Sequence, residues 1–144
     1  MYKRLFLFLI WLIAGFNCSI AQVDYPGNKP GFSSIKKTRK TITLENKALA
    51  MSFATNGDKL TIAGFIDKQT HEHLAIGKSS LFSLLVSDKT ITSDEFTLVG
   101  SATISDITGD ESALKYADKL SGKKLSADLE DAKLGLKVHW EASL

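Results

Sequence analysis

Residues 49–67 read LAMSFATNGDKLTIAGFID, and this stretch decides the fold class. Its large apolar side chains alternate with small or polar ones, a period of two that is typical of a β-strand with one buried face. Asn56-Gly57-Asp58 divides the stretch, because Asn and Gly tolerate the positive φ of tight hairpin turns. The pattern predicts two antiparallel strands. In the second strand, Phe65 is expected on the face opposite to Leu60, Ile62, Gly64 and Ile66.

The same alternation continues along the chain on both sides of this stretch. Strands are predicted near 41–45, 74–76, 82–86, 96–104, 125–129 and 134–144, with polar turns at 67–70 and 87–90. Many short strands about ten residues apart, separated by turn residues, predict an all-β fold, an antiparallel β-sandwich. Four aromatic side chains lie on the apolar faces and are expected in the core: Phe53, Phe82, Phe96 and Trp140.

Residues 110–121 break the strand pattern. Apolar side chains recur here at helical spacing, acidic residues come first, and Gly122 follows. The apolar positions are Ala113, Leu114, Ala117 and Leu120. One short helix is therefore predicted near 112–121, between two strands.

Residues 1–21 have the features of a secretory signal peptide. Lys3 and Arg4 precede an uncharged apolar run at 5–16, which is too short to span a bilayer. Ser19-Ile20-Ala21 then supplies small residues before a cleavage site. The chain is therefore predicted to be exported to the periplasm, the extracellular space or the cell surface.

Cleavage after Ala21 would remove the only cysteine, Cys18, and leave no disulfide. A lipid anchor on Cys18 is the less favoured alternative, because Asn17 is larger than the residue that a lipidation motif requires before the cysteine. The precursor has 18 basic and 16 acidic residues, and loss of Lys3 and Arg4 leaves equal numbers. A neutral domain has no general attraction for nucleic acid or for anionic membranes.

The remainder is predicted to be a single domain preceded by an arm. Residues 22–40 contain both prolines of the chain and end in a basic cluster, so an extended, solvated arm is expected there. The domain is predicted at 41–144. The apolar alternation of 134–144 continues to the last residue, and an unfinished apolar strand edge favours aggregation. The sandwich is therefore expected to be truncated, incomplete at its C-terminus.

The sequence contains no catalytic, phosphate-binding or paired-cysteine metal motif. His71-Glu72-His73 could place two imidazoles on one strand face, but it adjoins a turn and has no evident further ligand. The adjacent carboxylates at 94–95, 110–111 and 130–131 point apart, whereas glycoside hydrolysis needs two that face each other. We therefore predict no catalytic residue, no metal site and no cofactor.

Sugar-binding modules commonly use exposed aromatic side chains as platforms for pyranose rings. After the aromatics assigned to the core are set aside, three side chains remain as candidates for carbohydrate contact. They are Tyr25, Phe32 and Tyr116.

Five segments carry a resemblance to a known family: LAMSF at 49–53, LTIAGFID at 60–67, FSL at 82–84, ADKLSGKKL at 117–125 and LKVHW at 136–140. The chain from Ala48 onward resembles the N-terminal β-sandwich domain of secreted bacterial glycoside hydrolases related to α-galactosidases. Some of these proteins are described as enterotoxin-like or as carrying carbohydrate-binding modules. Similar domains often have Thr-Gly in the turn after Asp67, whereas here Thr70 is followed by His71.

The resemblance implies a sandwich of the galactose-mutarotase-like or supersandwich type and a place in a glycan-degrading system. The expected function is that of a non-catalytic module which packs on a catalytic barrel that this chain does not contain. The alternative is a free-standing secreted module that binds carbohydrate or protein. A small enzyme is the least favoured hypothesis, and neither a nucleic-acid partner nor a membrane span is expected.

Overall fold

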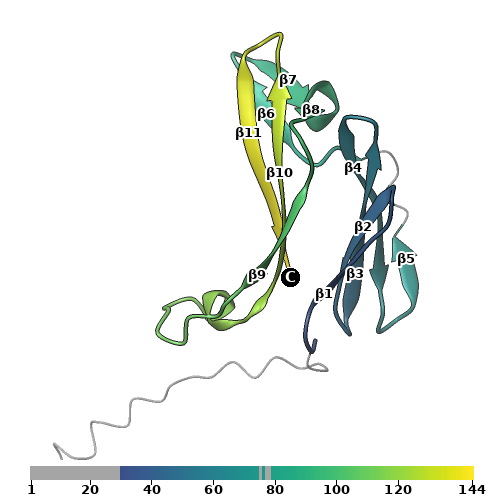
Figure 1. Ribbon diagram of the computed structural model, residues 1–144, viewed down its shortest axis with the longest axis vertical. Coiled ribbons are helices and arrows are strands. Elements are labelled where there is room, and N and C mark those ends of the chain that lie inside the picture. Colours follow the sequence, from purple (N-terminus) through teal and green to yellow (C-terminus); the bar gives the residue numbers. More distant parts are fainter. Residues whose placement is uncertain (1–29, 75, 77–78) are drawn as a thin grey trace, which may run out of the picture.

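The computed structural model describes residues 30–74, 76 and 79–144 (Figure 1). Strands make up 55% of these residues and helix 6%, and the strands pair antiparallel. The predicted all-β, antiparallel fold class is therefore confirmed. The predicted signal peptide, Cys18 and Tyr25 lie outside the described residues. Within the described ranges, no helix has the length and apolar character needed to cross a membrane.

A five-stranded sheet forms the first layer. Its strands follow chain order: β1 (Ser34–Lys37), β2 (Thr41–Glu45), β3 (Leu49–Asn56), β4 (Lys59–Asp67) and β5 (Glu72–Leu74). The hairpin predicted between β3 and β4 is confirmed, and Gly57 takes a φ of 64° in its two-residue turn. β1 lies within the segment that was expected to be an extended arm. It forms the edge of this sheet by pairing with β2.

A β-bulge in β4 corrects one predicted strand face. Ser52 lies opposite Gly64, but the next residue, Phe53, lies opposite Ile62, so Ala63 is the extra residue. Directly opposed residues of two paired strands have their side chains on the same face of the sheet. The extra residue therefore reverses, from Gly64 onward, which residues of β4 face the core. The prediction that Ile66 shares a face with Leu60 and Ile62 is therefore wrong. Phe65 takes that position, opposite Met51.

A four-stranded sheet is built around β10 (Gly122–Asp131). β11 (Leu136–Ser143) pairs along one side of β10, and two short strands, β8 (Thr97–Leu98) and β9 (Thr103–Ile107), pair with the other side. The single strand predicted at 96–104 is thus two strands. Gly100, with a φ of 74°, lies in the interruption between them.

The two sheets face each other and share one apolar core (Figure 1). Its buried side chains come from both layers: Ile42, Leu44, Phe53, Leu60, Ala102, Leu125 and Ala127. β6 (Ser83–Val86) and β7 (Lys89–Thr92) form a hairpin that packs on the part of β10 and β11 next to the turn between them. The buried residues of this second cluster are Ile91, Phe96 and Leu129. Phe53 and Phe96 are fully buried and Phe82 and Trp140 half-buried, so the four aromatics predicted for the core are there.

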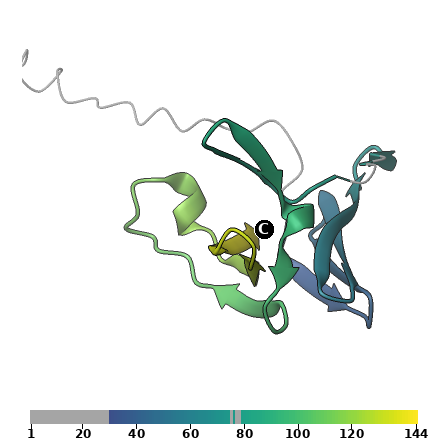
Figure 2. The same cartoon turned by 90° about the horizontal axis from the view of Figure 1, so that it is seen from above.

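The connection between β9 and β10 contains only a single turn of 3-10 helix, η2 (Tyr116–Lys119). This is shorter than the segment 112–121 in which one short helix was predicted. The other 3-10 turn, η1 (Ser93–Glu95), precedes β8. In Figure 1 the β9–β10 connection projects beyond the rest of its sheet, and Figure 2 shows it lying apart from the five-stranded layer.

β11 alternates half-buried and exposed side chains along its whole length, as the sequence pattern predicts. Its half-buried side chains face the core, and its exposed ones lie on the outer face of the sheet. β10 is the only strand paired with β11 in the described part of the chain. β11 is therefore an edge strand of eight residues.

Candidate functional site

The two described residues that were predicted to contact carbohydrate lie on different elements. Phe32 is 94% exposed and lies just before β1, whereas Tyr116 is 66% exposed and lies in the β9–β10 connection. The close ring pairs among the described residues are Phe53–Trp140 and Phe82–Phe96, and neither candidate takes part in one. The structure therefore shows no shared aromatic platform for Phe32 and Tyr116.

Tyr116 instead belongs to a group of exposed apolar side chains in the β9–β10 connection. Leu114 is fully exposed, and Leu120 is 49% exposed. We call Leu114, Tyr116 and Leu120 the apolar loop. Leu114 and Leu120 are two of the apolar positions whose helical spacing predicted a short helix, and both side chains are exposed, as is Tyr116.

Hydrogen bonds within the connection hold the apolar loop in place. The N–H of Asp110 donates to the Asp118 carbonyl at 2.9 Å, and the N–H of Gly109 donates to the Ser121 hydroxyl at 3.1 Å. Asp110 also accepts hydrogen bonds from Ser112, chiefly from its hydroxyl, and these lower the pKa of the Asp110 carboxyl. The loop thus owes its conformation to polar contacts rather than to burial of its apolar side chains.

The carboxylate pairs found in the sequence have local structural roles. One member of each pair accepts a hydrogen bond from a nearby residue: Glu95 from Thr92, Asp110 from Ser112 and Asp131 from Lys133. His71 lies in a turn and His73 in β5, and both are exposed. Within the described ranges, no group of three or more His, Cys, Asp or Glu side chains is arranged to hold a metal ion.

An ion-pair ladder that was not predicted from the sequence covers the outer face of β10 and β11. His139 contacts Asp128 through Nδ1 at 2.6 Å and Glu141 through Nε2 at 3.2 Å, and Lys124 contacts Glu141 at 2.6 Å. The hydrogen bond to Asp128, and then that to Glu141, raise the pKa of His139. Lys124, followed by His139, lowers the pKa of Glu141.

Both ring nitrogens of His139 are occupied in this ladder, so neither is available to take a proton from a nucleophile. The arrangement is that of a surface ion-pair network. The sequence contains a sign of this network in the polar residues that alternate with the apolar ones along β11. His139 and Glu141 are two residues apart, so their side chains share a face of the strand. The apolar positions of β11 predicted the strand, but they carry no information on this network.

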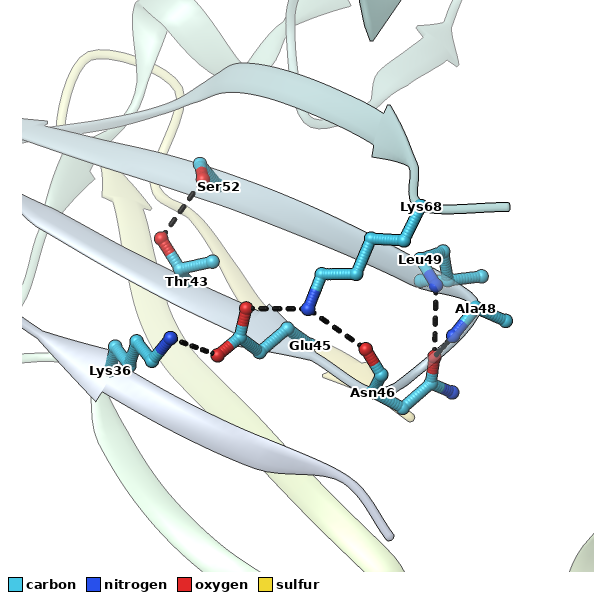
Figure 3. A network of polar contacts seen from close by, with 8 residues as sticks. All are labelled: Lys36, Thr43, Glu45, Asn46, Ala48, Leu49, Ser52 and Lys68. Atoms are coloured by element: carbon cyan, nitrogen blue, oxygen red, sulfur yellow. Dashed lines mark hydrogen bonds and ion pairs between the residues drawn. The ribbon is translucent and has the colours of Figure 1, made fainter. Parts of the chain in front are cut away.

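A second polar network lies on the outer face of the five-stranded sheet (Figure 3). The Glu45 carboxylate is 13% exposed and lies 2.5 Å from the Lys36 ammonium and 2.7 Å from that of Lys68. Hydrogen bonds from Lys36 and then from Lys68 lower the pKa of Glu45. Because Lys68 also donates to the Asn46 carbonyl, the network ties β1 and β2 to the end of β4.

Comparison of the chain with models of known protein families, with curated proteins and with solved structures finds no match. The polar networks on both outer faces stabilise the sheets. In the apolar loop, three exposed apolar side chains lie within seven residues of one connection, and the packing of the four-stranded sheet does not explain their exposure.

Proposed function

We propose that this chain is an exported, non-catalytic accessory module of a secreted glycoside hydrolase of the α-galactosidase-like type. In this proposal the module docks on the catalytic domain through the apolar loop. The observation that carries the proposal is the exposure of Leu114, Tyr116 and Leu120 on a projecting connection. Grouped exposed apolar side chains are typical of surfaces that bind a partner.

Exposure of these apolar side chains to water costs free energy that a partner would recover. Each square ångström of apolar surface that a partner removes from water contributes about 25 cal/mol. The hydrogen bonds at Gly109 and Asp110 already hold the connection in a defined conformation. Docking would therefore gain most of this hydrophobic free energy without a large cost in ordering the loop.

The contacts of two described carboxylates and one histidine support the non-catalytic part of the proposal. Asp110 and Asp131 bind nearby groups of their own turns, and His139 lies between two carboxylates. General acid–base chemistry on a glycosidic bond needs a facing pair of carboxyl groups at a substrate site. The choice of partner follows the family resemblance carried by segments such as 117–125, which overlaps the apolar loop.

The second candidate function is carbohydrate binding by a free-standing module, and the observation that favours it is the exposed ring of Tyr116. An aromatic face can stack on a pyranose, whereas Leu114 has no comparable use for a polyhydroxylated ligand. Tyr116→Ala would weaken both protein and glycan binding. Leu114→Ser would weaken protein binding alone.

The test is to mix the purified chain with the catalytic domain of an exported α-galactosidase-like hydrolase from the same organism. The two should co-elute as a complex in size-exclusion chromatography with light scattering. In parallel, the chain alone should neither hydrolyse a panel of aryl glycosides nor bind the corresponding oligosaccharides in calorimetry. Turnover by the chain alone would refute the proposal, and oligosaccharide binding without complex formation would favour the second candidate.

A further inference from the structure

The outer edge of β11 presents a row of main-chain groups that no described strand uses. Lys123 and Leu144 exchange both of their main-chain hydrogen bonds. Hydrogen-bonded and non-bonded pairs alternate along an antiparallel ladder, so the even-numbered residues of β11 bond to β10. The N–H and C=O groups of the odd-numbered residues therefore point away from β10. These are Lys137, His139, Glu141 and Ser143.

This edge lacks the features that usually prevent strands from pairing. At the edges of the five-stranded sheet, β1 has four residues, two of them lysines, and β5 has three. Short strands and repeated like charges block the addition of another strand. β11 has eight residues, no proline, and a mixture of charges on its outer face. Figure 1 shows it as the border of its sheet.

β11 is complementary to itself when two copies run antiparallel about Trp140. In this register, residues whose numbers add to 280 lie opposite each other. On the outer face His139 then lies opposite Glu141 of the second copy. On the inner face Val138 lies opposite Ala142, and Trp140 lies opposite its own counterpart. Opposite charges and paired aromatics across strands are both stabilising.

The alternative register about His139 is less favourable. It would place His139 opposite the same side chain of the second copy, and its raised pKa means that both would carry charge over a wider pH range. It would also leave Leu144 beyond the paired segment. The register about Trp140 pairs all of 136–144 and uses every outward-pointing main-chain group of the odd-numbered residues.

We propose that the chain forms a twofold-symmetric dimer in which β11 of each copy pairs antiparallel with β11 of the other, in register about Trp140. The two four-stranded sheets then form one continuous sheet, and the half-buried side chains of β11 are covered further. The dimer uses the β11 edge and not the apolar loop. It therefore stands or fails independently of the proposed function.

Proline at position 139 tests the edge. The His139 N–H points away from β10, so His139→Pro removes two intermolecular main-chain donors per dimer and no main-chain hydrogen bond within the sheet. Like the control below, it also removes the contacts of the imidazole with Asp128 and Glu141. Sedimentation equilibrium of the full chain should show a monomer–dimer equilibrium. In the His139→Pro variant the dissociation constant of the dimer should be at least about tenfold higher than in the wild type. Two hydrogen bonds are lost, and each changes the constant by about a factor of five. The matched control His139→Thr keeps the N–H and should change the dissociation constant of the dimer by less than about threefold.

A second variant is expected to bind more tightly, a result that misfolding could not produce. Ser143→Glu places a carboxylate opposite Lys137 of the second copy and should tighten the dimer about two- to threefold. A wild-type chain that stays monomeric up to submillimolar concentration would overturn the proposal. So would a dimer that His139→Pro leaves intact.

The register itself can be measured with spin labels. Lys137→Cys in a Cys18→Ser background has a single cysteine. In the proposed register the two copies of residue 137 are offset by six residues, which is about 20 Å at about 3.3 Å per residue. The register about His139 offsets them by four residues, about 14 Å apart with the strand spacing included. A distance near the shorter value would contradict the proposed register.

Discussion

The ring of Phe53 packs edge-on against the indole of Trp140, with ring centroids 5.2 Å apart and ring planes at 71°. Phe53 belongs to β3 in the five-stranded sheet, and Trp140 belongs to β11 in the four-stranded sheet. The contact therefore joins the two layers at the centre of the core. Such aromatic pairs contribute about 0.5–1.5 kcal/mol beyond the area that they bury.

Phe53→Ala should lower the free energy of unfolding by about 3–5 kcal/mol, because it removes a fully buried ring and leaves a cavity. The control Phe32→Ala alters a ring that is 94% exposed and should change stability by less than about 0.5 kcal/mol. Urea unfolding followed by tryptophan fluorescence measures both. Equal effects of the two substitutions would mean that Phe53 does not lie in the core that joins the sheets.

Two hairpin loops of the chain have the same local design. The Oδ1 atom of Asp67 accepts hydrogen bonds from the N–H groups of Gln69 and Thr70, and His71 then takes a φ of 62°. Asp131 accepts from the N–H groups two and three residues later in the same way, and Gly135 takes a φ of 66°. The first loop thus has histidine at the left-handed position where the second has glycine.

His71→Gly should stabilise the protein by about 0.5–1 kcal/mol, because a left-handed conformation costs a residue with a Cβ about 1–2 kcal/mol. Gly135→Ala is the reverse change and should destabilise the protein by a similar amount. Thermal unfolding of both variants checks the pair. A destabilised His71→Gly variant would show that the imidazole contributes more than the backbone strain costs.

The β6–β7 hairpin can be stabilised at its turn. Ser87 and Asp88 both have positive φ, 47° and 63°, in a two-residue loop, as type I′ turns require. Asn-Gly is the preferred pair for such turns, so Ser87→Asn with Asp88→Gly should raise the free energy of unfolding by about 1 kcal/mol. The reverse-order control, Ser87→Gly with Asp88→Asn, should gain less. A loss of stability in the Asn-Gly variant would contradict the turn geometry.

The ion-pair ladder predicts a pH dependence with a definite sign. Because folding raises the pKa of His139, its ion pairs stabilise fully below the unfolded value of about 6.5. This stabilisation is lost as pH rises through the folded pKa. The stability difference between the wild type and His139→Gln should therefore be larger at about pH 5.5 than at about pH 9.

Added salt provides the control for the ladder. His139 is 58% exposed, so screening should reduce the difference between the wild type and His139→Gln. Chemical denaturation in buffers across this pH range measures the effect. A difference that grows toward high pH would show that the imidazole is stabilised in its neutral form.

The strands could be predicted because a period of two in the side chains follows directly from strand geometry. The strands predicted at 125–129 and 134–144 correspond to β10 (Gly122–Asp131) and β11 (Leu136–Ser143), with different bounds. The bulge at Ala63 could not be predicted, because an inserted residue leaves no mark in the composition and only shifts which side chains share a face. The interruption at Gly100 was missed because alternation continues across it.

The candidate site could be predicted only in part. Tyr116 was named from its residue type, but its apolar neighbours Leu114 and Leu120 were assigned to a helix. Apolar side chains at helical spacing form a buried face only where the rest of the protein packs against them. Here the connection projects into solvent. The ladder at His139 was missed because its members come from two strands, and their register depends on the hairpin between them.

The most direct test of the docking account is a titration of the α-galactosidase-like catalytic domain with three forms of the chain. Leu114→Ser combined with Tyr116→Ala should weaken binding more than about tenfold, because each buried apolar side chain contributes about 1.5–3 kcal/mol. Leu85→Ser, which alters a leucine that is 73% exposed on the β6–β7 hairpin, should bind like the wild type. Equal affinity of all three forms, or no binding by the wild type, would contradict the account.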